Sequence, residues 1–393
     1  MTSGPGVPLS TQEQWRHVRR HLNAHRHELA LLATELYPSS WRIAGSPLLA
    51  RREWIAPAPI ALEHVQITWC DSPHRRGVTG HEVAWRSTLP LRGDGRRFAS
   101  YAQALAQLDP PQLLENRAAY RLLHVEPRDA DAELRFTRGS YFDVIDICEA
   151  VAHELAASVL ASDHGGAAPA MRHLPLRASI DDPTDLARRP VIPAISVLTL
   201  RREGPNAATC LLHWRDAAKV ASGGGLYQVA PVGLFQPSSD TTFNEANDFD
   251  LWRSIARELS EELLGASEDY NSDHQPIDYE RWPFHTTLAA ARREGALRVF
   301  WLGLGIDPLT LVADLLVVAV FDAELFDTVF PRLASTNAEG HLVRLHDETG
   351  ATTGVPFTAP TVERFTTGEP MQPAGAALLR VAWRHRDTLL GAG

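Results

Sequence analysis

Apolar residues recur with two different periods along the chain, and these periods separate predicted helices from predicted strands. Over residues 11–36, apolar positions lie three or four apart among Arg, His and Gln, which predicts one amphipathic helix. Short runs rich in β-branched and aromatic residues predict strands at 65–69, 83–88, 120–125 and 134–136. A longer apolar pattern over 142–160 predicts a helix that closes the first half of the chain.

The second half shows the same two patterns in a different order. Strands are predicted at 195–201, 209–214, 226–230, 297–303 and 311–321. The segment Glu203-Gly204-Pro205-Asn206 predicts a turn that joins the first two of these strands as a hairpin. Helices are predicted over 250–264 and from about residue 323.

A segment of weak periodicity divides the chain. Residues 163–193 are rich in Gly, Ala, Asp, Arg and Pro, a composition typical of a connection, and Asp181-Asp182-Pro183 favours a turn within it. A chain of 393 residues also exceeds the usual size of one domain. We therefore predict an α+β domain of unassigned role over 1–185, and an α/β domain with a C-terminal helical extension over 186–393.

Composition and charge narrow the class of protein. The chain is 44% hydrophobic and 22% charged, which is typical of a folded soluble protein. Its formal charge of -10 disfavours nucleic acid as a partner. The only lysine is Lys219, and Val220 follows it, so a Walker-type phosphate loop is excluded.

The cysteines and the apolar runs indicate the compartment. Cys70, Cys148 and Cys210 are far apart and odd in number, which predicts neither a disulfide framework nor a zinc knuckle. The apolar run 309–321 is too short for a membrane span and is interrupted by Asp314. We therefore expect a cytoplasmic protein without a membrane partner.

One predicted helix carries a candidate chemical site. On a helical wheel of 250–264 the apolar residues form one stripe, and Glu258, Glu261 and Glu262 lie within an arc of roughly 100° at its border. Carboxylates this close repel one another unless a cation or hydrogen-bond donors compensate. Mg²⁺ or Mn²⁺ would do so, since hard cations prefer carboxylate oxygens together with substrate phosphate. The alternative is a solvated helix face with internal ion pairs.

The residues around this helix resemble a known motif. The Nudix hydrolases share the pattern G-x5-E-x7-R-E-U-x-E-E-x-G-U, in which U is a bulky aliphatic residue, within a strand, loop and helix. Here a turn at Pro231-Val232-Gly233 precedes Arg257-Glu258-Leu259-Ser260-Glu261-Glu262-Leu263-Leu264-Gly265, whose Arg-Glu-Leu-x-Glu-Glu core agrees with the pattern at each position. The resemblance covers about 190–345 and implies a Nudix-like mixed sheet flanked by helices.

Three positions depart from the pattern. Arg257 follows Gly233 by 24 positions, so the connecting loop is ten residues longer than in the pattern. Phe249 stands where the pattern has its first Glu, so Asp248, Asp250 or Glu245 would have to orient Arg257. Gly265 comes one residue late. We expect the loop 234–247 to lie near the glutamates as a cover or a specificity element.

The resemblance also implies residue roles and a reaction. Glu258, Glu261 and Glu262 would hold the cation, Glu258 would also be a candidate general base, and Arg257 would position it; Gly233 would belong to the cofactor-binding turn. The reaction would be hydrolysis of a diphosphate linkage in a nucleotide derivative, giving a nucleoside monophosphate and a phosphorylated remainder. The alternative is a Nudix-like module that binds a nucleotide as a sensor without turnover. A homodimer is left open for either.

Several other residues could take part in chemistry, and each favours a structural interpretation. These are the glycines 223–225 as a flexible loop, Lys219 as a solvated loop cation, Glu149, His153 and Glu154 as a helix face without a metal-binding order, and Asp314 as an edge or loop position in an apolar strand.

Overall fold

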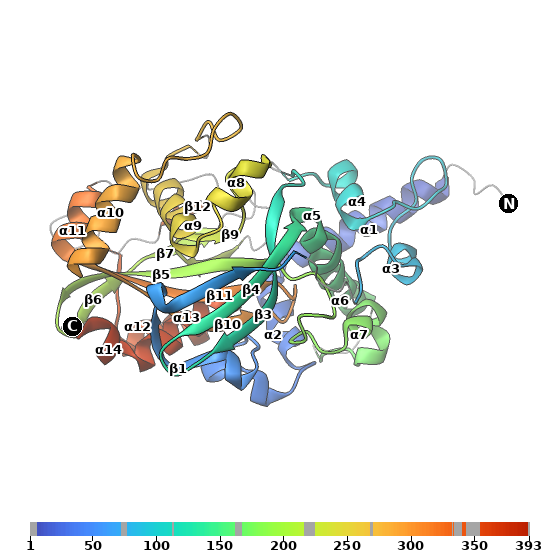
Figure 1. The fold of residues 1–393 in the computed structure, drawn as a ribbon. Helices are drawn as coiled ribbons and strands as arrows, with labels where there is room; N and C mark the ends of the chain where they lie inside the picture. The colour runs from blue at the N-terminus through green and yellow to red at the C-terminus, as the bar shows by residue number, and fades with distance from the viewer. Residues whose placement is uncertain are drawn as a thin grey trace.

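The computed structural model describes residues 6–71, 77–111, 114–161, 167–215, 225–267, 270–331, 333, 340–342 and 354–391. In this part of the chain a seven-stranded mixed sheet forms the centre, with strand order β1-β10-β11-β5-β6-β13 and with β9 also paired to β5 (Figure 1). Its strands are β1 (Ile55–Ala61), β5 (Pro193–Gly204), β6 (Ala207–Cys210), β9 (Val232–Leu234), β10 (Leu297–Ile306), β11 (Ala313–Asp322) and β13 (Val355–Pro356).

The central strands are covered on both faces. The parallel pair β5 and β11 is almost entirely buried, and such near-continuous apolar runs are typical of strands packed between two layers. Helix α13 (Pro373–Arg384) packs on one face, while α10 (Pro283–Glu294) and α11 (Ala323–Val329) lie on the other (Figure 1). The predicted α/β class, with a mixed sheet flanked by helices, is confirmed.

The first half of the chain is joined to this sheet. Strand β1 is an edge strand of the main sheet through its antiparallel pairing with β10. A second sheet of β2 (Val65–Trp69), β4 (Ala132–Ser140) and β3 (Ala118–Pro127) packs beside it, and one continuous apolar core includes residues of both halves. The domain expected over 1–185 therefore shares a sheet and a core with 186–393, although a separate domain was expected.

The expected connection between the halves is firmly packed where it is described. Arg177, on helix α7 (Pro175–Ile180), is 1% exposed and donates to the carbonyl oxygens of Pro308 and Leu309 at 2.6 Å each. Arg189 is fully buried and donates to the carbonyl of Leu311 at 2.7 Å. Because buried guanidinium groups satisfy backbone acceptors here, parts of 167–193 are packed into the core, while other residues of the segment are exposed.

Several predicted elements differ in detail. The single helix over 11–36 is two helices, α1 (Gly6–Ala24) and α2 (Arg26–Thr34), interrupted at His25. The strand predicted at 83–88 is wrong, because α3 (Val83–Ser87) is a short helix that buries only Trp85 and leaves Val83 77% exposed.

The strand predicted at 209–214 is divided between two sheets. It breaks after β6, and β7 (Leu212–Arg215) pairs instead with β8 (Leu226–Val229) and β12 (Gly340–Leu342). The remaining strands predicted in the second half, and the helix from residue 323, lie where they were expected.

A cluster of buried charged side chains connects the N-terminal helices to the helix that closes the first half through hydrogen bonds. That helix comprises α5 (Tyr141–Val144), a π-helical turn (Ile145–Glu149) and α6 (Ala150–Ala161). Glu149, 3% exposed, accepts hydrogen bonds from Arg19 and from Arg26, the latter at 3.0 and 3.3 Å. Burial raises the pKa of Glu149, but Arg26 and Arg19 outweigh burial and lower it to about 2.

We predict that Glu149→Gln lowers the free energy of unfolding by about 3 kcal/mol at pH 7, because two buried arginines lose their counter-charge. The folded-state pKa of Glu149 is depressed, so its contribution is fully present above the ordinary pKa of 4.5 and is lost as pH falls toward 2. Urea unfolding of the parent and the variant between pH 7 and pH 3 measures this, with exposed Glu13→Gln as the control. A difference that does not shrink in acid would contradict the assignment.

Candidate functional site

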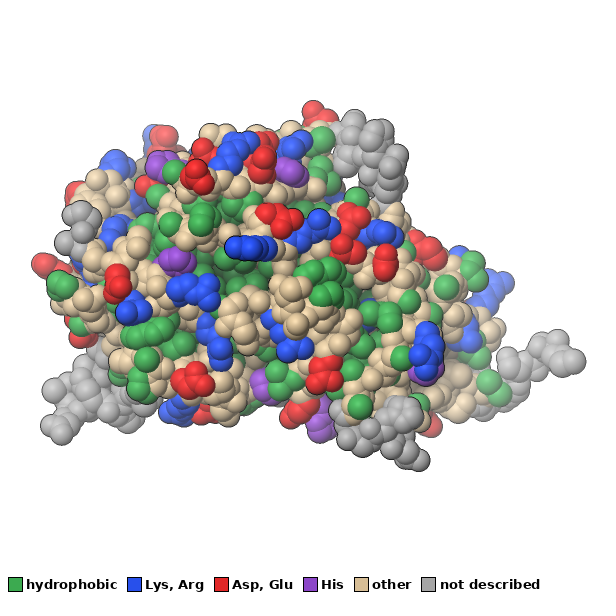
Figure 2. Space-filling model, turned by 90° about the horizontal axis from the view of Figure 1, so that it is seen from below, with side chains coloured by type: hydrophobic (Ala, Val, Ile, Leu, Met, Phe, Trp, Pro, Cys, Tyr) green, Lys and Arg blue, Asp and Glu red, His purple; other side chains and the backbone are tan. Residues whose placement is uncertain are grey.

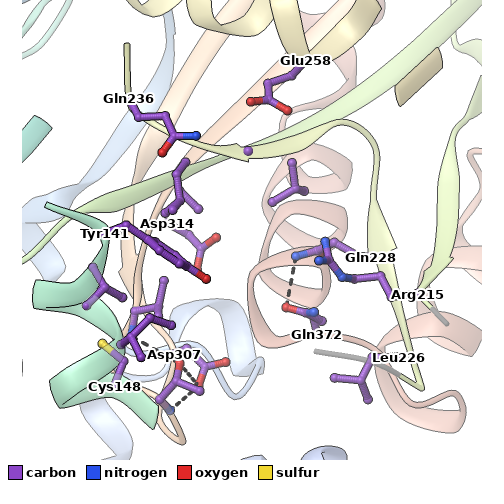
Figure 3. A pocket seen from close by; sticks show the side chains of 18 of the residues that line it. Tyr141, Cys148, Arg215, Leu226, Gln228, Gln236, Glu258, Asp307, Asp314 and Gln372 are labelled. Carbon is purple, nitrogen blue, oxygen red and sulfur yellow. Dashed lines mark hydrogen bonds between the residues drawn. The ribbon is translucent and has the colours of Figure 1, made fainter. Parts of the chain in front are cut away.

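A cavity of about 590 Å³ lies where the two halves of the chain meet. The second half contributes the glutamates of the predicted site, the β9 turn, the β7–β8 hairpin and the start of β11 (Figure 3). The first half contributes residues of α2 and of the helix that begins with α5. The polar and charged side chains that line it are Arg26, Glu115, Arg117, Tyr141, Glu149, Arg215, Gln228, Gln236, Glu258, Glu261, Glu262, Asp307, Thr310, Asp314 and Gln372.

The predicted helix is present and includes a π-helical turn. Helix α9 (Leu251–Glu258) begins at the cap Asp250, whose side chain accepts from the Arg253 N–H at 2.8 Å. The chain continues as a π-helical turn (Leu259–Leu263) and then reaches Gly265, whose φ of 68° lies in the left-handed region that favours glycine. The predicted apolar stripe through Leu251, Ile255 and Leu259 is buried as expected.

Glu258 lies directly against the β9 turn. A methyl group added at Gly233 would overlap the Glu258 carboxylate, so the absence of a side chain at Gly233 is what lets this carboxylate reach the backbone of β9. Both residues line the cavity. The structure therefore brings together Gly233 and Glu258, two residues that the sequence had placed in one site.

Glu261 and Glu262 line the same cavity but are held by different partners. Glu262 is 8% exposed; one oxygen accepts from the Val232 N–H at 2.7 Å, and the other lies 3.9 Å from His213 Nδ1. Glu261 accepts from the Tyr270 hydroxyl at 2.8 Å. Among the described residues, no three Asp, Glu, His or Cys side chains meet as a ready-made metal site in this conformation. The oxygen donors fit Mg²⁺ or Mn²⁺ in chemistry, but holding a cation would require them to exchange these partners.

Arg257 is not among the residues that line the cavity, and it contacts the loop before the helix. It is 5% exposed and donates to the Tyr279 hydroxyl at 2.6 Å and to the Gln236 carbonyl at 2.7 Å. Of the three carboxylates proposed to orient it, Asp248 does so, 3.7 Å away and fully buried. Asp250 caps the helix instead, and Glu245 pairs with Arg138 at 3.0 Å. These are the contacts of a positioning residue, and the role of Arg257 in catalysis stays a prediction.

Phe249, at the position of the motif's first Glu, joins an aromatic cluster. Its ring centroid lies 5.1 Å from Tyr120 and 5.8 Å from Phe136, both in the first half, and 6.0 Å from Phe235. Aromatic packing between the halves thus replaces a charged residue there.

The longer loop reaches the cavity only in part. Gln236 lines it, whereas the following helix α8 (Thr242–Asn247) is anchored by buried Asn244, which donates to the Ser272 carbonyl at 2.7 Å. A role as cover or specificity element stays a prediction.

Asp314 lines the cavity, although the sequence favoured a structural interpretation for it. The expected edge or loop position is wrong, because β11 pairs with β10 on one side and with β5 on the other at Asp314. It is 6% exposed, lines the cavity and accepts from the Ser196 hydroxyl at 2.8 Å. Burial raises the pKa of Asp314 to about 7. A charged residue interrupting an apolar run was the available signal.

The first-half residues of the cavity had no such signal. Arg26 and Tyr141 belong to helices far from the motif in sequence, and only the packing of the two halves brings them to the cavity.

Glu154 and His153, interpreted as part of a helix face, have hydrogen-bond partners within the protein. Glu154 accepts from the N–H groups of Leu176 and Arg177 at 2.6 and 3.0 Å, and His153 contacts the Tyr101 hydroxyl at 3.1 Å. Burial raises the pKa of the cavity-lining thiol Cys148 to about 12, so it is protonated at neutral pH. Lys219, Gly223 and Gly224 lie outside the described residues.

In comparisons with known proteins, no family model and no curated protein matches the chain. Across the described residues, none of the helices combines the length and apolarity needed to span a bilayer. On the face seen in Figure 2, basic and acidic side chains are interspersed.

We predict that Gly233→Ala lowers the free energy of unfolding by about 1–3 kcal/mol, because the added methyl group must displace the Glu258 carboxylate. Gly204→Ala is the matched control, since no atom lies within 4 Å of the added carbon there. Chemical denaturation measures both. Equal stabilities of the two variants would contradict the close packing of Glu258 on Gly233.

We predict that the contribution of Asp314 to the free energy of unfolding depends on pH in the opposite sense to that of Glu149. Its folded pKa, about 7, lies above the ordinary 3.8, so its contribution to stability is present below pH 3.8 and is lost as pH rises through 7. We expect Asp314→Asn to be more stable than the parent at pH 8 by roughly 2–4 kcal/mol, with the gain vanishing near pH 4. Denaturation across this range measures the gain, with exposed Asp273→Asn as the control; a pH-independent difference would refute the assignment.

Proposed function

We propose that the cavity binds a nucleotide diphosphate derivative through a divalent cation and hydrolyses the diphosphate linkage, as the resemblance to Nudix hydrolases implies. The observation that carries this proposal is that Glu258, Glu261 and Glu262, all from the Arg-Glu-Leu-x-Glu-Glu segment, line one cavity together with Gly233. Three carboxylates that share a cavity with phosphate-sized space favour a cation as their common partner.

Two of the departures from the motif have a structural compensation, which supports the resemblance. A π-helical turn holds one residue more than an α-helical turn, and this accounts for Gly265 coming one residue late. Asp248, one position before Phe249, supplies the carboxylate beside Arg257 that the motif's first Glu would supply. The mixed sheet between helices is compatible with a Nudix-like fold.

Different side chains of the cavity would have different roles in such a reaction. Oxygens of Glu258, Glu261 and Glu262 would hold Mg²⁺ or Mn²⁺, which when bound polarises a phosphoryl oxygen and lowers the pKa of water. Glu258, on the turn at Gly233, is the candidate base that takes the proton from the attacking water. Arg215, which projects into the cavity from β7, would neutralise phosphate charge (Figure 3). Arg257 holds the helix against its loop.

A second candidate is a nucleotide-binding module without turnover. It is favoured by the partners of the glutamates, since Glu262 is held by the Val232 N–H and Glu261 by the Tyr270 hydroxyl. A ligand could then bind the cavity without assembling a catalytic cation site.

We predict that Mg²⁺ raises the melting temperature of the parent and raises that of Glu262→Gln much less, because the cation binds the folded state through the carboxylate that the variant loses. Glutamine keeps an acceptor for the Val232 N–H, so the variant should fold. Glu294→Gln, on α10 and outside the cavity, is the matched control. Thermal melting at matched ionic strength measures these shifts.

The same proteins, incubated with ADP derivatives and Mg²⁺ or Mn²⁺, distinguish the two candidates. Release of a nucleoside monophosphate by the parent and its loss in Glu262→Gln support the hydrolase. Binding without product supports the nucleotide-binding module. Equal Mg²⁺ shifts in all three proteins would reject the glutamates as a cation site.

A further inference from the structure

Tyr270 holds one of the three glutamates of the proposed cation site. It lies beyond Gly265, on the stretch that connects the helix of the glutamates to α10, and its hydroxyl donates to Glu261 Oε1 at 2.8 Å. This distance is typical of an O–H···O hydrogen bond. Tyr270 is not among the residues that line the cavity, and the reaction proposed above gives it no role.

The position of this hydroxyl is fixed by contacts other than the one with Glu261. The Tyr270 ring meets the ring of Trp282 edge to face, with the centroids 5.4 Å apart, and Trp282 directly precedes α10. Close by in the chain, the carbonyl of Ser272 accepts from the buried Asn244 side chain at 2.7 Å. Ring packing and a buried backbone contact therefore hold the hydroxyl beside the helix of the glutamates.

The other two glutamates are directed to a different part of the structure. Glu262 accepts through Oε1 from the Val232 N–H at 2.7 Å, and the Glu258 carboxylate lies against Gly233, the next residue of β9. The Cα atoms of consecutive residues are about 3.8 Å apart, so these two carboxylates reach neighbouring points of one strand. Glu261 is held by Tyr270 instead, and among the described residues no three such side chains meet as a cation site.

The hydroxyl and a divalent cation compete for the carboxylate of Glu261. Each stabilises the ionised form, the hydroxyl through a hydrogen bond and the cation through its charge. The ligand oxygens of Mg²⁺ lie about 2.1 Å from the ion, so Glu261 must leave its present position to join Glu258 and Glu262 around one ion. The hydrogen bond from Tyr270 is broken in that step, and it therefore opposes cation binding.

We propose that the Tyr270 hydroxyl is a built-in competitor of the cation. It holds Glu261 apart from Glu258 and Glu262, and the cation displaces it to assemble the site. The inference rests on the proposed function, because it takes the three glutamates as the cation ligands. Tyr270 thereby sets the concentration of divalent cation at which the site fills.

The experiment compares Tyr270→Phe with the parent and uses Mn²⁺ alone as the probe. Phenylalanine keeps the ring on Trp282 and removes only the hydroxyl, so the variant should fold. Electron paramagnetic resonance of free Mn²⁺, titrated with the full chain, measures the dissociation constant without turnover. Because a hydrogen bond to a charged group no longer opposes binding, Tyr270→Phe should bind Mn²⁺ roughly tenfold more tightly. Tyr101→Phe, at a buried tyrosine outside the cavity, should bind as the parent does.

Glu261→Gln supplies a second test of the same competition. Glutamine keeps an acceptor for the Tyr270 hydroxyl but removes the charge for which the hydroxyl and the cation compete. This variant should bind Mn²⁺ more weakly than the parent, and adding Tyr270→Phe to it should change the affinity much less than in the parent. An equal gain in both backgrounds would show that Tyr270 acts on another group and would overturn the proposal.

The remaining outcomes separate this inference from the proposed function. Weaker Mn²⁺ binding by Tyr270→Phe would mean that Tyr270 orients Glu261 as a ligand, and equal binding would mean that the hydroxyl has no part; either result rejects the competitor and leaves the cation site. No Mn²⁺ binding by either protein rejects both. Tighter binding by Tyr270→Phe, without release of a nucleoside monophosphate from ADP derivatives, supports the competitor and rejects the hydrolase.

Discussion

The parallel pairing of β5 with β11 is the constraint on which the rest of the structure depends. The two strands run in register from Pro193 opposite Ala313 to Arg202 opposite Asp322. Parallel strands cannot be joined by a tight turn, so the chain between β5 and β11 forms further elements, among them β6, β9 and β10 of the same sheet. The segment between the two strands also includes α9 and the glutamates. The pairing places Ala194 opposite Asp314, and both residues line the cavity.

The same pairing explains why the cavity is rich in buried charge. Asp314 is the second residue of a strand whose other residues are largely apolar and buried, and it is itself 6% exposed. The N-terminal helices close the opposite side with Arg26, which is fixed by Glu149. A sequence selected for stability alone would have apolar side chains at these positions, because buried ion pairs rarely stabilise a protein more than well-packed apolar side chains do. Their presence around an open volume favours a binding role.

The local periodicity of the sequence was sufficient to predict many of the helices and strands. It was not sufficient to predict how they pack together. Buried strands such as β5 and β11, and the helix of Glu258, could be predicted because each has a complete apolar pattern of its own. Strand β1 was missed, since Pro57 and Pro59 interrupt its pattern, and proline is tolerated there because β1 is an edge strand. Val83 and Trp85 alternate as in a strand, but a single buried tryptophan on one helical turn satisfies the same pattern.

The residues of the candidate site also divide into those that local sequence could predict and those that only the packing of the chain brings to the cavity. Glu258, Glu261, Glu262 and Gly233 could be predicted because a motif places them within one strand, loop and helix. Arg26 and Tyr141 could not, because no local rule relates α2 or α5 to β11. Asp248 was one of three alternatives, and only the burial of its carboxylate beside Arg257 distinguishes it from Asp250, which the helix N-terminus uses as a cap.

The departures from the motif are linked by a single geometric requirement. For Glu258 to lie on Gly233, the helix must be held at a fixed distance from β9, and that position is set by Arg257 and its contacts with Gln236 and Tyr279. Arg257 needs a carboxylate within reach but not at one particular position of the chain, so Asp248 can serve while Phe249 turns into the aromatic core. Past Glu258, the extra residue is absorbed by the π-helical turn, and the left-handed Gly265 then ends the helix. The helix therefore keeps its place on β9 although the loop is longer and two positions are shifted, which is why the glutamates line the cavity despite a motif that agrees only in its core.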